Sequence, residues 1–128
     1  MILTNLKVKG DFIETIVSEL GINPNECSHC IEVSAINHVH KKHGNMAQEI
    51  TRVQIAVTAS DFGLIPSIIE NPDYNRIDIT EKPLPVIVYS KKIENEYFYL
   101  EEVRKGKNIL ALKTMYIKKK PKQDIRAF

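Results

Sequence analysis

The sequence predicts an α+β fold, with N-terminal helices packed on one face of a C-terminal four-stranded antiparallel meander sheet. Two observations predict this class. Apolar residues recur at helical spacing in the first part of the chain, and from Arg76 onward they alternate with a period of two. The links between the alternating stretches are short and contain Gly, Asn or Pro, which is typical of antiparallel hairpins. Helices that precede such a meander pack together on its sheet.

The chain of 128 residues has the length of one domain, and with 43% apolar residues it can bury a core without disulfide bonds. We expect one domain over residues 1–120 and a basic, flexible tail over residues 121–128. No apolar run approaches the ~20 residues that span a bilayer, and no secretory signal is visible. Two cysteines do not form a disulfide framework. These features predict a cytoplasmic site of action and no membrane partner.

Two helices are expected in the first part of the chain. The first covers residues 11–20, with Asp11 at the N-cap or in the first turn and Gly21 as its stop. The second is capped by Ser34 and ends at Gly44, which we expect in the left-handed conformation. Cationic side chains in the last turn of this second helix complement its dipole.

The segment of residues 46–57 fits two patterns. Its apolar residues match either one face of a helix or the alternation of a strand, and both interpretations stay open. Thr58 and Asp61 then form the pattern of a capping box, which predicts the start of a short helix. Pro66 can open a further helical turn, and Pro72 closes it.

The rest of the chain is expected to form four strands, over residues 76–80, 86–93, 97–103 and 109–119. In two of these strands, polar side chains follow apolar ones on one face. In the last strand this predicted face carries Leu110, Leu112, Thr114 and Tyr116. In the second strand it carries Val88, Ser90 and Lys92. These runs predict a polar pocket at the strand ends, although Thr and Tyr are also ordinary strand residues.

Three histidines and two lysines stand close together at the end of the second expected helix. At about 100° per residue, His43 shares the apolar face of Ile36 and Val39. His40 lies at the edge of that face, and His38 points away from it. A histidine at the border between core and solvent can have its pKa tuned for proton transfer. The alternative is a buried histidine that is hydrogen-bonded to a backbone carbonyl group.

Charge is distributed unevenly along the chain. Residues 104–128 carry nine Lys or Arg and one acid, whereas residues 1–103 carry nine Lys or Arg and fifteen acids. A basic C-terminal quarter on an acidic body predicts a face for a polyanion such as RNA or DNA. The alternative is a lysine-rich strand edge that protects against aggregation.

A zinc site is a second possibility for the histidines. The spacing resembles that of zinc ligands, and the candidate set is Cys27, Cys30, His40 and His43. The gap between the two pairs is short for a zinc finger. The sequence contains no glycine-rich nucleotide cradle. It also lacks paired acids near the histidines, which argues against a two-metal nuclease.

Cleavage of RNA without a metal requires a base for the 2′-hydroxyl, an acid for the leaving oxygen and cations for the phosphate. Histidine, lysine, threonine and tyrosine side chains supply these groups at the end of the second helix and at the ends of the strands. An α+β fold can bring these two places together.

Three motifs resemble those of the barnase–EndoU–colicin–RelE-like RNase superfamily, and its phage-associated (PBECR-type) branch is the most similar. They are His-Val-x-Lys-Lys-His-Gly at the helix end, Ile-Pro-x-Ile-Ile-x-Asn-Pro-Asp, and Lys-Thr-Met-Tyr in the last strand. The resemblance spans about residues 30–119. It implies a metal-independent endoribonuclease of the toxin type, without a cofactor. It also implies an immunity protein or antitoxin, and delivery by phage or by secretion as part of a larger protein.

The resemblance assigns roles to particular residues. His38 and His43 match the paired histidines of the helix motif, and Thr114 with Tyr116 matches the last-strand motif. Lys92 would hold the phosphate, by position only. The match departs from the pattern in that glycine follows His43 and in that His38 points away on a regular helix, so His40 competes as the second imidazole.

Three hypotheses follow. The first is an endoribonuclease with RNA, for example tRNA, as its substrate, in which four lysines contact the RNA backbone: Lys41, Lys42, Lys118 and Lys119. The second is a non-enzymatic basic module that binds nucleic acid. The third is a zinc-stabilised interaction domain.

Overall fold

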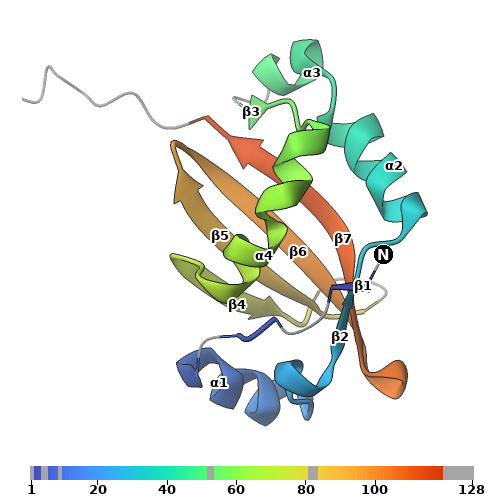
Figure 1. Cartoon of the computed structure of the whole chain (residues 1–128), viewed down its shortest axis with the longest axis vertical. Helices are drawn as coiled ribbons and strands as arrows, with labels where there is room; N and C mark the ends of the chain where they lie inside the picture. Colours follow the sequence, from blue (N-terminus) through green and yellow to red (C-terminus); the bar gives the residue numbers. More distant parts are fainter. Residues whose placement is uncertain (1, 4–5, 9, 52–53, 81–83, 120–128) are drawn as a thin grey trace, which may run out of the picture.

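A mixed β-sheet forms the centre of the computed structural model, which describes residues 2–3, 6–8, 10–51, 54–80 and 84–119 (Figure 1). In this part of the chain the sheet has seven strands, in the order β1-β2-β7-β6-β5-β4, and β3 also pairs with β7. The strands are β1 (Ile2–Leu3), β2 (Ser28–Cys30), β3 (Gln54–Ile55), β4 (Tyr74–Asp78), β5 (Val86–Ile93), β6 (Asn95–Arg104) and β7 (Ile109–Lys118). The predicted tail, residues 121–128, lies outside the described residues.

The α+β class and the C-terminal hairpins are as predicted, since β4 to β7 pair antiparallel in sequence order. The prediction that these four strands make up the whole sheet is wrong. Strand β2 joins β7 in parallel, with Ser28 opposite Ile109, and β1 joins β2. Strand β3 pairs with the other end of β7. The added strands are two or three residues long, too short for alternation to show in the sequence.

Helices lie on one face of the sheet and along one edge (Figure 1). Phe12 packs edge-on against Tyr89 of β5, with ring centroids 6.5 Å apart, and so fixes the first helix on the sheet. The second helix lies beside β7, and the third follows it. The helices are α1 (Gly10–Leu20), α2 (Val33–His43), α3 (Met46–Thr51) and α4 (Ile65–Glu70), with 3-10 turns η1 (Pro24–Glu26), η2 (Ala59–Leu64) and η3 (Lys105–Lys107). No helix among the described residues is long and apolar enough to cross a membrane.

The two ends of α2 differ from the prediction. Ser34 is not the N-cap, because the helix begins at Val33 and Glu32 takes the cap position. Gly44 is the C-cap but has φ −97°, which is not the left-handed conformation. A Cβ atom at Gly44 would lie 2.5 Å from the His40 carbonyl oxygen. Glycine is therefore needed here for the close approach of the backbone rather than for a positive φ.

The segment that fitted two patterns contains both structures. It begins as helix α3 and continues as strand β3, with residues 52–53 outside the described part. The capping box is confirmed, because the Thr58 backbone N–H donates to Asp61 Oδ2 at 2.7 Å at the start of η2.

A bulge at Lys113 decides which side chains share a face of the sheet. Leu100 and Glu101 are consecutive, yet they pair with Thr114 and Leu112, so Lys113 is the extra residue. The expectation that Thr114 and Tyr116 continue the face of Leu110 and Leu112 is therefore wrong. The two leucines lie on the face covered by helices, and Thr114 and Tyr116 lie on the opposite one.

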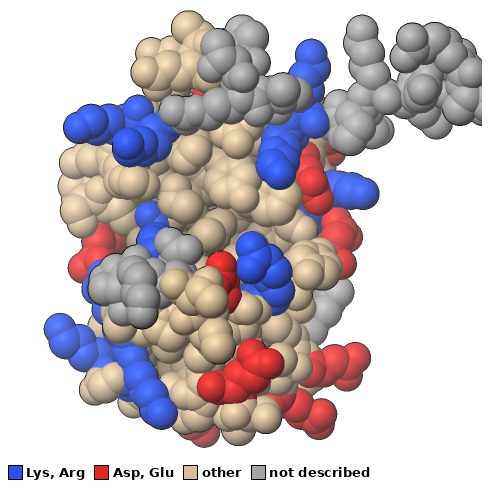
Figure 2. All heavy atoms as spheres, turned by 180° about the vertical axis from the view of Figure 1, so that it is seen from behind, with Lys and Arg blue, Asp and Glu red and all other residues tan. Residues whose placement is uncertain are grey.

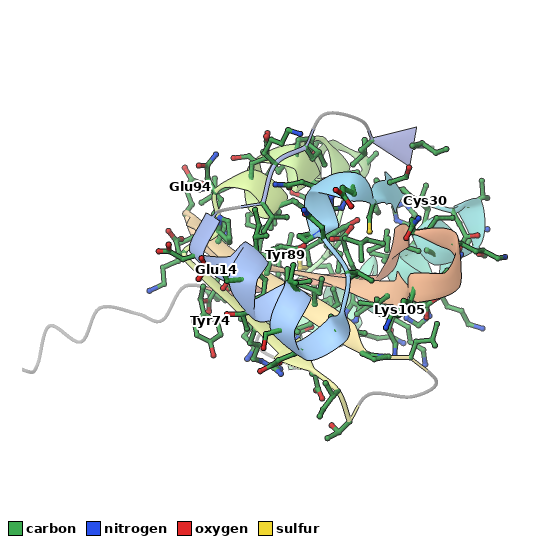
Figure 3. All side chains as sticks on the ribbon, turned by 90° about the horizontal axis from the view of Figure 1, so that it is seen from below. Glu14, Cys30, Tyr74, Tyr89, Glu94 and Lys105 are labelled. Carbon is green, nitrogen blue, oxygen red and sulfur yellow. The ribbon has the colours of Figure 1, made fainter. Side chains whose placement is uncertain are left out.

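The opposite face, called the open face below, is seen in Figure 2. It presents three rows of directly paired residues: Lys118, Glu96 and Lys92; Tyr116, Phe98, Ser90 and Tyr74; and Thr114, Leu100, Val88 and Arg76. Figure 2 shows a largely uncharged centre with Lys and Arg side chains on both sides of its upper half. In Figure 3, Tyr74 lies on the side of the sheet away from Tyr89, which belongs to the covered face.

Candidate active site

His43 is the last residue of α2, at the place where the helix reaches the end of β7. Val39, one turn earlier, is fully buried and anchors the helix in the core. The His43 side chain keeps 16% of its surface exposed. Its carbonyl oxygen accepts a hydrogen bond of 2.7 Å from the Val57 N–H, which fixes the backbone beside β3. The sequence correctly predicts this imidazole at the border between core and solvent.

Glu49 of α3 holds the His43 ring. Its Oε2 lies 3.3 Å from His43 Nδ1, and its side chain is completely buried. The Asn45 side chain accepts hydrogen bonds from the N–H groups of Ala47 and Gln48 and so sets the start of α3. Glu49 was not among the residues selected from the sequence. The only signal for it was an acidic residue six positions after His43, in the segment that follows the histidine cluster.

Aromatic rings continue from His43 onto the open face. The His43 and Tyr116 ring centroids are 5.5 Å apart. Tyr116 stacks on Phe98 of β6, with centroids 4.8 Å apart and an interplanar angle of 11°. Lys118 Nζ lies 5.1 Å from the centre of the Phe98 ring, in the geometry of a cation–π contact. Phe98 is a site residue that the sequence analysis did not select.

The Tyr116 hydroxyl stays protonated at neutral pH. Partial burial raises its pKa, Arg76 on the same face opposes the rise, and Glu96 adds to it. A neutral tyrosine hydroxyl can donate a hydrogen bond. Tyr116 therefore carries a hydrogen-bond donor, and its ring lies against the His43 ring.

The two other histidines of α2 lie in different surroundings. The His40 ring lies 5.6 Å from the Phe62 ring in η2, which precedes α4 on the covered side. His38 is exposed, and its pKa is lowered by desolvation first and then by the charges of His43 and Lys42. Burial, the largest of these causes, therefore favours the neutral form of His38.

Thr114, in β7, and Lys92, in β5, both lie on the open face. Thr114 precedes Tyr116 in the adjacent row, and its hydroxyl oxygen is buried with no hydrogen-bond partner among the described residues. Lys92 is exposed in the row of Glu96 and Lys118, two strands away from β7. The structure therefore places Thr114 close to Tyr116 and places Lys92 farther along the face.

The four lysines expected along an RNA backbone are all exposed. They form two groups, Lys41 and Lys42 in the last turn of α2 and Lys118 and Lys119 at the end of β7. Both groups lie near the end of the sheet where His43 contacts Tyr116.

The predicted zinc set is not assembled. Within the described ranges, no three His, Cys, Asp or Glu side chains form a group that could hold a metal ion. The Cys27 thiol donates to the Asn23 carbonyl oxygen at 3.4 Å, and burial raises its pKa. His40 and His43 are engaged with Phe62 and Glu49 at the end of α2.

A second histidine–glutamate pair lies under the helices. His29 Nδ1 is 2.6 Å from Glu101 Oε2, and the two residues are 1% and 0% exposed. Burial of the two hydroxyl groups is the main cause that raises the pKa values of Tyr89 and Tyr99, and the charge of Glu101 raises them further. Neither member of the pair was a sequence candidate, because 72 positions separate them and no local motif joins them.

A comparison with protein-family models matches residues 7–124 to the family described as phage-Barnase-EndoU-ColicinE5/D-RelE like nuclease 3. The match covers most of the chain. The chain belongs to this nuclease family. The predicted resemblance to this nuclease superfamily is thereby confirmed. Searches of curated proteins and of solved structures find no match.

Membership in this nuclease family gives nucleic acid as the class of substrate. The open face brings together the groups that phosphodiester chemistry uses: an imidazole with a carboxylate partner, hydroxyl groups and lysines.

Proposed function

We propose that this chain is a toxin-type endoribonuclease that cleaves RNA without a metal, by attack of the 2′-hydroxyl on the adjacent phosphate. The observation that carries the proposal is the His43 ring, held by buried Glu49 and in contact with Tyr116 on the open face. In the reaction, the 2′-oxygen bonds to phosphorus and the bond to the 5′-oxygen breaks. The products are a 2′,3′-cyclic phosphate and a 5′-hydroxyl end.

His43 is the proposed proton-transfer group. A carboxylate at Nδ1 keeps the proton on that nitrogen, so Nε2 exchanges protons with the substrate. Glu49 is completely buried and so cannot reach the substrate itself. It acts as a positioning residue.

His38 is the better candidate for the second imidazole than His40. Its lowered pKa keeps it neutral at neutral pH, as a proton acceptor requires. His40 packs against Phe62, away from the open face. An exposed ring at His38 would have to turn toward the phosphate when RNA binds.

The phosphate would be held by the hydroxyl groups of Thr114 and Tyr116 and by Lys118. The Thr114 hydroxyl oxygen is buried without a hydrogen-bond partner among the described residues, so a phosphate would reach it only if the side chains around it move. Lys92 would contact the RNA backbone farther along the face, and Lys41, Lys42 and Lys119 would contact it near the helix. A toxic nuclease also requires an immunity protein or antitoxin in the cell that makes it.

The test is cleavage of purified RNA in the presence of EDTA, followed by analysis of the new ends. We expect cyclic phosphate ends, and we expect His43→Gln to reduce the rate by about 100- to 10,000-fold. His40→Gln is the matched control on the same helix and should cut normally. Intact RNA, cleavage that requires an added divalent metal, or normal cleavage by His43→Gln would contradict the proposal.

A further inference from the structure

We propose that the row Tyr116, Phe98, Ser90 and Tyr74 is a track for the bases of single-stranded RNA, running from His43 across the open face to the far edge of the sheet. The inference rests on the proposed ribonuclease function and specifies its substrate as unpaired RNA. It assigns binding roles to Phe98 and Tyr74, which stand outside the proton-transfer group.

The register makes the row straight. Tyr116 pairs directly with Phe98, Phe98 with Ser90, and Ser90 with Tyr74. The row therefore crosses β7, β6, β5 and β4 at right angles to the strands. Three strand spacings cover about 14 Å, a length that suits a few nucleotides of an extended single strand.

The aromatic side chains lie on the open face instead of packing into a core, and a base that stacks on Phe98 would take the place of the Lys118 ammonium group 5.1 Å from its ring centre. Phe98 and Tyr116 are both half-buried and stack on each other. Tyr74 keeps 59% of its surface exposed and lies on the open face (Figure 3). Ser90 between them is small and 2% exposed, so it forms a floor. Exposed aromatic rings on a sheet are a common means of stacking unpaired bases.

Cations flank the row on both sides, as a sugar–phosphate backbone requires. Lys118 and Lys92 lie in the row on one side, and Arg76 lies in the row on the other. Acidic residues partly balance these charges: Glu96 stands between the two lysines, and Asp78 pairs with Arg76 at 3.5 Å. Because the local charge is mixed, stacking has to contribute a large share of the affinity.

A duplex does not fit this arrangement. Paired bases are stacked on their neighbours inside the helix, so their faces are not available to Phe98 or Tyr74. A single strand can place one base after another on the rings. The nucleotide at the Tyr116 end then lies beside His43, and the following ones extend toward Tyr74.

The test is binding of a 2′-O-methyl RNA about eight nucleotides long, which cannot be cleaved, with 2-aminopurine as one base. Stacking should quench the 2-aminopurine fluorescence. We expect Phe98→Leu and Tyr74→Ala each to reduce the affinity by about 5- to 100-fold. Tyr97→Phe is the matched control, because Tyr97 is adjacent in β6 but faces the other side and bonds Asp61. The same oligonucleotide annealed to its complement should bind more weakly than the single strand.

Equal affinity for duplex and single strand, or wild-type affinity in both variants, would overturn the proposal. If Phe98→Leu fails to fold, Tyr74→Ala decides, because that side chain is largely exposed. Failure of the ribonuclease proposal is separate, since binding needs no cleavage. If the protein binds the strand through Phe98 and Tyr74 but leaves RNA intact, the binding proposal stands and the ribonuclease proposal fails.

Discussion

Two histidine–glutamate pairs with the same chemistry lie in opposite parts of this molecule. His29 and Glu101 are 2.6 Å apart and sealed on the covered face, with exposures of 1% and 0%. His43 and Glu49 are 3.3 Å apart at the sheet edge, where only the glutamate is sealed and the histidine side chain stays 16% exposed. A histidine–glutamate pair alone therefore does not identify a candidate catalytic group. The imidazole must also be accessible to a substrate.

The residues around the two pairs support the same distinction. His29 and Glu101 share their surroundings with Tyr89 and Tyr99, whose hydroxyl groups are kept neutral by burial. His43 instead meets Tyr116, beside a stacked phenylalanine and a lysine on the open face. We therefore expect changes in the buried pair to alter stability, and changes in the edge pair to alter turnover.

The largest expected effect is on stability, from Glu101→Ala. Removing one partner of a buried pair leaves His29 without its acceptor, which costs about 3–5 kcal/mol of unfolding free energy. Urea unfolding of the purified variant measures this loss. Turnover per folded molecule should stay at the wild-type value. A variant that is as stable as the wild type, or one that folds well but no longer cuts, would break the distinction between the pairs.

A smaller effect, on turnover, is expected from Glu49→Gln. The amide oxygen can still accept from Nδ1, but a bond to a neutral acceptor is weaker by about 1 kcal/mol than one to a carboxylate. We expect the cleavage rate to fall about fivefold, with the affinity for a non-cleavable RNA unchanged. Urea unfolding of the same variant serves as the control for packing around α3. A wild-type rate would show that Glu49 does not position the ring.

The smallest effect is the pH dependence that His38 contributes to stability. Its pKa is lower in the folded protein than in the unfolded chain, first because of desolvation. The unfolded state therefore binds more protons as the pH falls, so His38 adds stability above its unfolded pKa of about 6.5 and loses it as the pH falls through the folded pKa. Melting between neutral pH and about pH 5 should show a slightly smaller loss in His38→Gln. The effect is small because solvent screens an exposed ring, and a larger loss in the variant would contradict the assigned direction.

The sequence predicts much of the meander and the position of His43, because both depend on local periodicity. Strand β5 covers its predicted residues, burial alternates along β6, and Val39 and His43 lie where the helical spacing puts them. The face of Thr114 and Tyr116 could not be predicted, since one bulge residue, Lys113, reverses the alternation without a signal of its own.

Contacts between distant segments are the other part that the sequence hides. Strand β2 is three residues long and pairs with β7 about 80 positions later. The same long-range pairing brings His29 beside Glu101. In the sequence, Phe98 is only one more residue of an alternating strand. Its place in the candidate site becomes visible once its pairing and stacking with Tyr116 are known. Local patterns locate the catalytic candidate, and tertiary pairing is needed to find what surrounds it.

The most direct test of the account follows the imidazole resonances of His43 and His29 by NMR while a non-cleavable RNA strand is added. We expect the Nε2 signal of His43 to shift, its proton to stay on Nδ1, and the His29 signals not to move. Shifts at His29 with His43 unchanged would show that His43 is not the group that meets the RNA, and would place the chemistry at the buried pair.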